Sequence, residues 1–295
     1  MSGIKILKNK IYGVRNTRKI TNAMEMISAS KMRKAQIHIH SILPYSNKVR
    51  DIASDIFRCD SEYQHPYLKY KKKVKSVGII VITTNKGLCG GLNSNIFRII
   101  LSKLKFFEKK NISFQITVLG KKGIEFFKQI GVYITSESVK IYSKTKIEYL
   151  LNIVENQINN FLNDIVQEVY LAYTKFLSII NNCPTFVRIL PISKIEKYEV
   201  CKSDYSKKSI LNKNYKYKYI YEPSEKSIID YLFKKYIENF LFQSLLENIA
   251  SEHSSRMISM KSASENANKI IDNLELMYNK KRQNIITQEL SEIVY

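Results

Sequence analysis

The chain has 295 residues, enough for one large domain or two smaller ones, and a formal net charge of +22 that comes mostly from lysine. No apolar run approaches the roughly 18–20 residues that cross a bilayer, and the N-terminus MSGIKILKNKIYG lacks the apolar stretch of a signal peptide. These features exclude a membrane-spanning protein and predict a cytoplasmic chain.

Residues 2–57 are predicted to form one long helix. Apolar residues recur at steps of three and four: Ile4, Leu7, Ile11, Val14 and, after a small phase shift, Ile20, Met24 and Ile27. Pro44 lies inside the pattern and is expected to kink or interrupt the helix. The helix would be roughly 80 Å long, well beyond the length of a helix in a globular domain.

The central part of the chain has a different pattern, in which short apolar runs alternate with helical segments. The predicted strands are 76–84, 114–120, 168–176, 185–192 and 215–221, and the predicted helices are 94–109, 121–130 and 147–164. This alternation predicts a parallel or mixed sheet covered by helices, as in Rossmann-like α/β domains. Residues 196–214 are expected to form a polar, lysine-rich surface loop.

A second long helix is predicted for residues 225–290, which contain neither proline nor glycine. Its seam alternates steps of three and four: Met257, Met260, Ser264, Ala267, Ile271, Leu274, Tyr278 and Lys281. If both long helices leave the same face of the central domain, they run antiparallel and bury each other's stripes. The longer C-terminal helix then extends beyond its partner, with the unusually apolar end NIITQELSEIVY.

The predicted architecture is therefore an antiparallel coiled coil attached to a central α/β domain. We expect the N-terminal coiled-coil helix in residues 1–58, the Rossmann-like domain in 74–222, and the C-terminal helix in 223–295, paired with the first.

Cysteines and histidines offer no site for metal or nucleophilic chemistry. The cysteines are scattered without a CxxC pair: Cys59, Cys89, Cys183 and Cys201. His38 and His40 are two residues apart and point in different directions on a helix. There is no HExxH motif and no nucleophile–base pair, so we expect no metal, no cofactor and no catalytic residue.

The net charge of +22 raises nucleic-acid binding as an alternative function. However, arginine, which reads bases better than lysine does, is sparse. Abundant lysine, isoleucine, asparagine and tyrosine are also what AT-rich codons produce. Codon bias explains much of the charge, although the resulting basic surface favours acidic partners.

The segment TTNKGLCGGLNSN, residues 83–95, raises a second alternative, a nucleotide-binding enzyme. Glycine-rich turns between a strand and a helix bind phosphates through unpaired N–H groups and the helix dipole. The spacing of Gly87, Gly90 and Gly91 matches neither the P-loop nor GxGxxG. We therefore expect these glycines to form a structural turn that packs closely, against the base of the coiled coil.

Three segments closely resemble the gamma subunit family of bacterial F-type ATP synthases. They are NTRKITNAMEMISASKMRKAQ at residues 16–36, TTNKGLCGGLNSNIF at 83–97, and the C-terminal stretch at 250–294 that ends in KKRQNIITQELSEIV. The resemblance covers essentially the whole chain and is weakest at 133–165 and 196–214. The loop departs from the family at Asn85 and Lys86, where an acid and an arginine are usual.

The resemblance implies a rotor without a catalytic residue of its own. Its coiled coil would pass through a ring of alpha and beta subunits, and its central domain would stand with the epsilon subunit on the c-subunit ring. Proton-driven rotation would then drive the beta subunits through ATP synthesis. The location implied is peripheral, on the cytoplasmic side of a bacterial inner membrane, with no nucleic acid bound.

The resemblance also suggests contact residues. Those toward the alpha and beta subunits are Met24, Lys31, Arg33, Arg282, Gln283, Thr287, Gln288 and Glu289, and those toward the c ring and epsilon are Tyr219 and Tyr221. A methionine can slide past changing partners, and an arginine can make paired hydrogen bonds to acidic groups. Coiled-coil packing, solvated helix faces and ordinary strand residues explain the same side chains without a partner.

Overall fold

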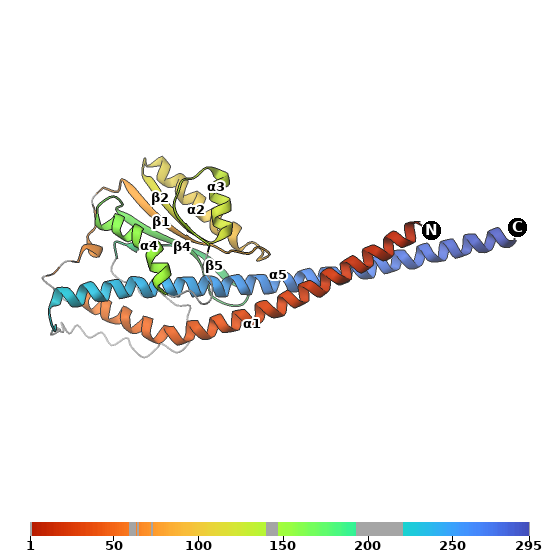
Figure 1. Cartoon of the computed structure of the whole chain (residues 1–295), viewed down its shortest axis with the longest axis horizontal. Coiled ribbons are helices and arrows are strands. Elements are labelled where there is room, and N and C mark those ends of the chain that lie inside the picture. The colour runs from red at the N-terminus through yellow and green to blue at the C-terminus, as the bar shows by residue number, and fades with distance from the viewer. Residues whose placement is uncertain are drawn as a thin grey trace.

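Two long antiparallel helices form the axis of the molecule (Figure 1). The computed structural model describes residues 2–58, 63, 65–71, 73–139, 147–192 and 221–294. Helix α1 (Ser2–Arg58) and helix α5 (Glu225–Val294) lie side by side, and both chain termini are at the same end of the pair. The end of α5 extends beyond the start of α1, as the sequence predicts.

The seam between the helices matches the predicted stripe on α5 except at its last residue, Lys281, which is exposed, and it matches only part of the stripe on α1. Met260, Ser264, Ala267 and Ile271 are all buried. On α1 the buried side chains in this half of the seam include the small or polar Thr21, Ser28 and Ala35 beside the apolar Ile11 and Met32. Ile20 and Ile27, predicted to lie in the seam, are instead 61% and 55% exposed. Small seam residues let the two backbones approach closely, which leaves the bulky isoleucines outside.

The central sheet has the strand order β3-β2-β1-β4-β5. Strands β1 (Ser76–Ile82), β2 (Ser113–Leu119), β3 (Ile134–Ser138) and β4 (Glu168–Phe176) pair in parallel. Strand β5 (Asn182–Leu190) is antiparallel to β4. The Rossmann-like α/β class predicted from the sequence is therefore correct.

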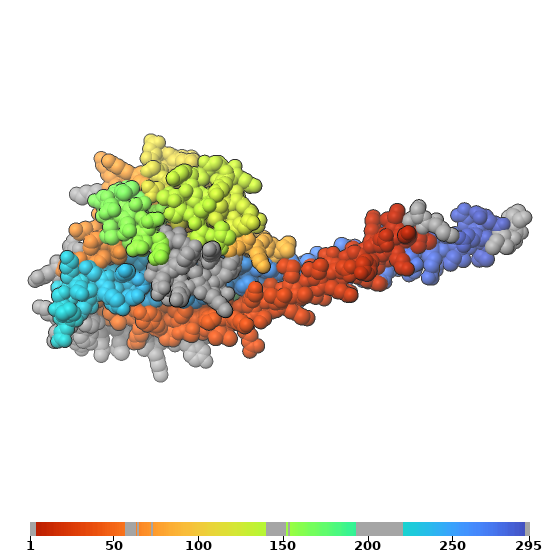
Figure 2. Space-filling view, in the orientation of Figure 1, coloured from red at the N-terminus to blue at the C-terminus, as the bar shows by residue number. Residues whose placement is uncertain are grey.

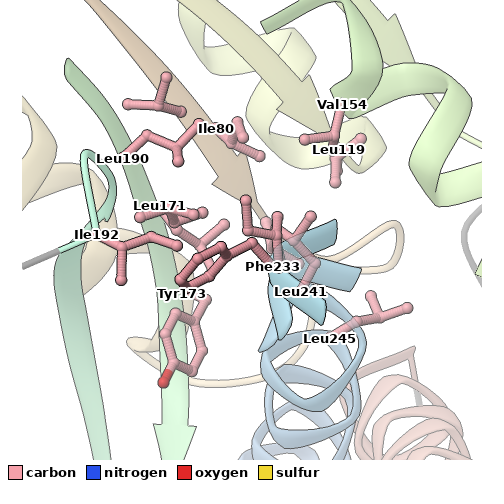
Figure 3. Close-up of a cluster of buried hydrophobic side chains, with 14 of the residues drawn as sticks. Ile80, Leu119, Val154, Leu171, Tyr173, Leu190, Ile192, Phe233, Leu241 and Leu245 are labelled. Atoms are coloured by element: carbon pink, nitrogen blue, oxygen red, sulfur yellow. The ribbon is translucent and has the colours of Figure 1, made fainter. Parts of the chain in front are cut away.

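Both faces of the sheet are covered, so its central strands are apolar throughout. Val77, Ile79 and Val81 pack on one face in a cluster with helices α2 (Leu92–Lys109) and α3 (Lys121–Ile130). On the other face Ile80 and Ile82 join a cluster that includes helix α4 (Ile147–Leu162) and α5. In Figure 3, Phe233 and Leu241 of α5 point toward sheet residues such as Leu171.

This second cluster joins the base of the coiled coil to the sheet. It also contains Ala53 and Ile56 of α1, while a short 3-10 helix (Pro66–Leu68) leads from α1 toward β1. Figure 2 shows the sheet domain on one side of the helix pair, over only one half of its length. The other half extends away from the domain as two helices alone.

Two expectations about the elements need correction. Helix α1 continues through Pro44, so of the two outcomes expected there, a kink or an interruption, the interruption does not occur. Pro44 and His40 are both exposed, so the carbonyl that proline leaves unpaired is open to solvent. Strand β3, a polar edge strand, was not predicted. Residues 215–220 of the predicted strand and the whole loop 196–214 lie outside the described residues, and Tyr221, four residues before α5 begins, has no strand structure.

No described helix is long and apolar enough to cross a membrane.

Candidate functional site at the junction of the long helices and the sheet

The glycine-rich segment lies at the position where doubly wound sheets usually bind ligands. Residues 83–91, here named the junction loop, connect the end of β1 to the start of α2. Strand β1 has β2 on one side and β4 on the other, so the strand order reverses here. Ligands of open α/β sheets bind at the carboxyl ends of the strands at such a point.

In this protein a side chain of α5 fills that position. Arg256 is buried, and its Nη2 donates to the carbonyl oxygens of Lys86 at 3.1 Å and Gly87 at 3.2 Å. Its Nε donates to the carbonyl of Gly87 at 3.3 Å. A phosphate site would present N–H donors to an anion, whereas this loop presents two carbonyl oxygens to a cation. The geometry opposes nucleotide binding here.

Glycine is required at one position of the junction loop by both conformation and space. Gly90 has a φ of +58°, and a Cβ atom built there would lie 2.9 Å from the Oγ of Ser259 on α5. Gly91 precedes the first residue of α2 with a φ of −83°, where any residue fits. A Cβ on Gly87 would have only the Cε of Lys122 near it, at 3.9 Å.

A polar network under the junction loop fixes its shape. Thr84 is fully buried and donates from Oγ1 to the carbonyl of Lys86 at 2.9 Å, while Asn93 Nδ2 donates to Thr84 Oγ1 at 2.7 Å. Asn93 also contacts the buried Sγ of Cys89, at 3.5 Å. Asn85 accepts from the N–H of Lys121, the first residue of α3, at 2.8 Å. The loop is thereby tied to two helices of its own domain.

Arg256 belongs to a buried group of charged side chains on α5. Its Nη2 donates to Glu252 Oε1 at 2.7 Å, and both side chains are less than 10% exposed. Burial raises the pKa of Glu252, and the neighbouring Arg256 opposes that rise. Burial, together with the charges of Arg256 and Lys31, lowers the pKa of His253 to about 4, so His253 is neutral at pH 7. Burial also raises the pKa of the Cys89 thiol.

The turn between β4 and β5 holds α5 at the same level. Ser254 donates from its hydroxyl to the carbonyl of Ile179, and Asn182 donates to the hydroxyl of Ser255 at 3.0 Å. Nearly two turns earlier, Asn248 accepts from the N–H of Thr174 at 3.2 Å. The helix is therefore bonded to two separate loops of the sheet domain within residues 254–259.

Beyond the junction, polar contacts join α5 to α1. Arg18 donates to Asn268 at 2.8 Å, and Arg15 pairs with Glu275 at 2.5 Å. Ser264, in the seam, donates to the side chain of Asn22. Met24 is half-buried beside this seam, and Lys31 and Arg33 are exposed further toward the base. The structure thus places these three predicted contact residues on the helix pair without bringing them into one site.

The predicted contact residues near the end of α5 are all exposed: Arg282, Gln283, Thr287, Gln288 and Glu289. Their hydrogen bonds are local, from Thr287 to the carbonyl of Gln283 and from Gln288 to Glu292. At the opposite end, Tyr221 is half-buried and packs against the core cluster at the start of α5. Tyr219 lies outside the described residues.

Sequence reasoning missed the residues that organise the junction, above all Glu252 and Arg256. The available signal was the segment ASEHSSRM, which puts an acid and an arginine four residues apart among small side chains on a predicted helix. Within the described part of the chain, no group of three or more metal-binding side chains comes together.

These features define a class of protein: a long two-helix shaft whose base is fastened to a doubly wound sheet, with one helix in the sheet's usual ligand position. A sequence profile described as ATP synthase matches residues 3–295. The chain is 45% identical to the ATP synthase gamma chain of Bordetella pertussis and 42% identical to that of Cupriavidus necator, over 100% of this chain and 98% of each relative. The chain belongs to the ATP synthase gamma chain family.

Solved structures support the fold. A chain in the Euglena gracilis mitochondrial ATP synthase, in a structure described as OSCP/F1/c-ring in rotational state 3, is similar with a TM-score of 0.68 at 18% identity. The match covers 99% of this chain and 93% of that one. A chain of the Tetrahymena thermophila central stalk and c-ring gives a TM-score of 0.58 at 22% identity, over 83% of this chain and 99% of that one.

Proposed function

We propose that this chain is the central rotor shaft of an F-type ATP synthase. Rotation of the membrane c ring, driven by protons, turns the shaft, and the turning shaft forces the catalytic beta subunits through the states of ATP synthesis. The family membership supports this role, as do the relatives named ATP synthase gamma chain and the similar chains in structures that contain a rotor or central stalk.

One observation about the chain itself carries the proposal: the helix pair beyond the sheet exposes large apolar side chains on both helices. They are Ile20, Met26 and Ile27 on α1 and Ile270, Leu276 and Met277 on α5, each between 49% and 72% exposed. Apolar surface gathered in this way marks a region that another protein covers. A ring of alpha and beta subunits around the shaft would cover both helices at once.

We infer that the chain supplies no catalytic group to the reaction. The bonding of Arg256 to the carbonyls of the junction loop supports this inference, because it removes the position at which a nucleotide would bind this fold. ATP would instead bind to other subunits of the complex. We place the chain on the cytoplasmic face of a bacterial inner membrane, held there through the complex.

Contacts with the ring are assigned to two regions of the shaft. Met24, Lys31 and Arg33 would face the lower lobes of the beta subunits, and Arg282 and Gln283, followed by Thr287, Gln288 and Glu289, would engage a beta loop near the tip. Their exposure, and the half-exposure of Met24, support this assignment. An arginine and an amide on one turn can make paired hydrogen bonds to acidic and hydroxyl groups.

The base of the molecule would stand on the c ring beside the epsilon subunit. We assign Tyr219 and Tyr221 to that contact, from the matching segment YIYEP. The position of Tyr221 at the start of α5, at the end of the molecule opposite the two termini, supports the assignment.

Native mass spectrometry of the chain mixed with the alpha and beta subunits of its own organism tests the proposal. We expect one copy of the chain for each ring of three alpha and three beta subunits. An intact ring that excludes the chain would contradict the proposal. Salt-sensitive binding of nucleic acid would then become the next measurement.

The tip contacts are tested by replacing Arg282 and Gln283 together with alanine. We expect the variant to assemble as the parent does, because both side chains are exposed and leave the fold unchanged. Proton-driven ATP synthesis should fall severalfold, because the shaft loses its paired hydrogen bonds to the ring. Unchanged synthesis in an assembled complex would remove this assignment.

A further inference from the structure

The junction is the last place at which the sheet domain holds the shaft. Residues 254–256 of α5 bond to the turn between β4 and β5 on one side and to the junction loop on the other. Further along, the hydrogen bonds of α5 to other elements are to α1, at Asn22, Arg18 and Arg15. Figure 1 shows the shaft leaving the domain as two helices at this level.

Below this level most contacts of α5 with the sheet are apolar, apart from hydrogen bonds of Asn248 and Ser251 to the backbone of Thr174. Nearer the base, α5 packs on the sheet through apolar side chains such as Phe233 and Leu241. Apolar contact is not directional, so packed surfaces can slide without breaking a specific bond. Arg256 instead makes three hydrogen bonds to two backbone carbonyls, with a planar guanidinium whose donors are fixed relative to one another.

The orientation of Arg256 is itself secured. Glu252, one turn earlier on the same helix, accepts from Nη2 at 2.7 Å and is buried. Ser259 closes the other side of the contact, since a Cβ on Gly90 would come within 2.9 Å of its hydroxyl oxygen. A rotation of α5 against the sheet therefore has to break charge-assisted hydrogen bonds in a buried site, where an unpaired charge is costly.

We propose that Arg256 is a positioning residue that fastens the junction loop to α5 and so sets the point where the rigid base ends and the free shaft begins. This inference rests on the proposed rotor function. When the bonds of Arg256 are lost, the sheet domain should fix a shorter part of α5. The part of the helix pair that is not fixed to the domain should become longer and easier to twist. A smaller share of the torque applied to the sheet domain by the c ring would then be transmitted to the alpha and beta subunits.

The test compares Arg256→Lys with a matched Arg188→Lys control in the assembled membrane complex. A lysine at position 256 keeps a cation near Glu252 but cannot bond two carbonyls through a planar fork. Arg188 is half-buried, less deeply than Arg256, and is also paired with a carboxylate, that of Glu168 at 3.3 Å, but it lies on β5 away from the junction. The same chemical change is thus made at and away from the junction.

Two readouts separate a fastening role from a general loss of stability. The first is the rate at which a thiol reagent labels Cys89, a residue of the junction loop that is only 3% exposed. Peptide mass resolves this label from that on the exposed Cys183, which serves as the reference. The second is the rate of proton-driven ATP synthesis divided by the rate of ATP hydrolysis. Arg256→Lys should speed Cys89 labelling at least tenfold and lower the ratio at least threefold. Arg188→Lys should change neither.

The outcomes distinguish this inference from the proposed function. If the parent chain does not assemble with its ring, the proposed function fails. If Arg256→Lys assembles and Cys89 stays protected, or the loop opens while the ratio is unchanged, the fastening role is overturned. Should Arg256→Lys fail to assemble, Glu252→Gln replaces it. This change keeps the side-chain shape, and we expect smaller shifts in both readouts in the same direction. No shift in either would also overturn the inference.

Discussion

At the scale of single residues, Gly90 combines a left-handed backbone conformation with a close approach to α5. Its φ of +58° costs an L-residue about 1–2 kcal/mol, and the new Cβ would press on Ser259. We expect Gly90→Ala to lower the free energy of unfolding by at least that amount, as measured by urea denaturation.

Gly13 provides the matched control for this change. It lies inside α1, and a Cβ there would meet nothing within 4 Å. Gly13→Ala should therefore stabilise the chain by up to about 1 kcal/mol, because alanine favours a helix more than glycine does. If Gly90→Ala kept or gained stability, as Gly13→Ala should, neither the backbone conformation nor the contact with Ser259 would disfavour alanine at position 90.

His253 should make stability depend on pH in a defined window. Its pKa is about 4 in the folded chain, against 6.5 for a free histidine, because of burial and the charges of Arg256 and Lys31. Between these values the unfolded chain binds more protons, so the folded state loses stability as pH falls from 6.5 to 4. The upper bound of the loss is about 3 kcal/mol.

Replacing His253 with glutamine isolates this contribution, since Glu252 and the other titrating groups remain in both chains. The parent should be the more stable at pH 7, and its advantage should shrink toward pH 4. Urea denaturation at several pH values measures this difference. A stability difference that stays constant with pH would mean that His253 does not titrate between 4 and 6.5.

At the scale of elements, the shaft should be held by its seam and not by its outer face. Ile271 is 5% exposed in the seam, whereas the adjacent Ile270 is 49% exposed. Ile271→Ala should lower the unfolding free energy by about 2 kcal/mol through lost burial and a new cavity. Ile270→Ala should change it by less than about 0.5 kcal/mol. Urea denaturation followed by far-UV circular dichroism compares the two variants. Equal losses of unfolding free energy would mean that the seam does not run through Ile271.

The elements that the sequence predicts well are those with long, uniform patterns. The two shaft helices stand out because their periodicity continues far beyond a normal helix, and β1 stands out as an apolar run buried on both faces. Strand β3, ITSES, escapes prediction because an edge strand with polar side chains alternating at its surface resembles a loop. Its place in the sheet depends on pairing with β2, a contact that local sequence does not encode.

The rule that apolar residues lie inside misassigns part of the shaft for a physical reason. Ile20 and Ile27 are outside, and Thr21 and Ser28 are inside. A single-chain pattern cannot separate a face buried in the chain from one that a partner covers. The junction was missed for another reason, since Arg256 meets Lys86 and Gly87 across some 170 positions of sequence. Only the assembled fold brings those groups together.

At the scale of the whole molecule, the end of α5 should matter to the complex and not to the chain alone. From Arg282 to Glu292 the helix is exposed except for the half-buried Ile285, and it extends beyond the start of α1. A chain ending at Lys281 should therefore keep the unfolding free energy of the parent within about 0.5 kcal/mol, because few buried contacts are lost.

The same shortened chain should bind its ring less well. Leu290 is 58% exposed and Ile286 is 47% exposed, and burying such side chains against a partner stabilises association by roughly 1.5–3 kcal/mol each. Native mass spectrometry should show fewer rings that contain the chain, and those rings should dissociate at a lower temperature. If instead the isolated chain lost stability, the end of α5 would belong to the fold of the shaft itself. Normal stability with normal assembly would mean that the ring contacts the shaft before Arg282 in the sequence, at the isoleucines that flank the seam.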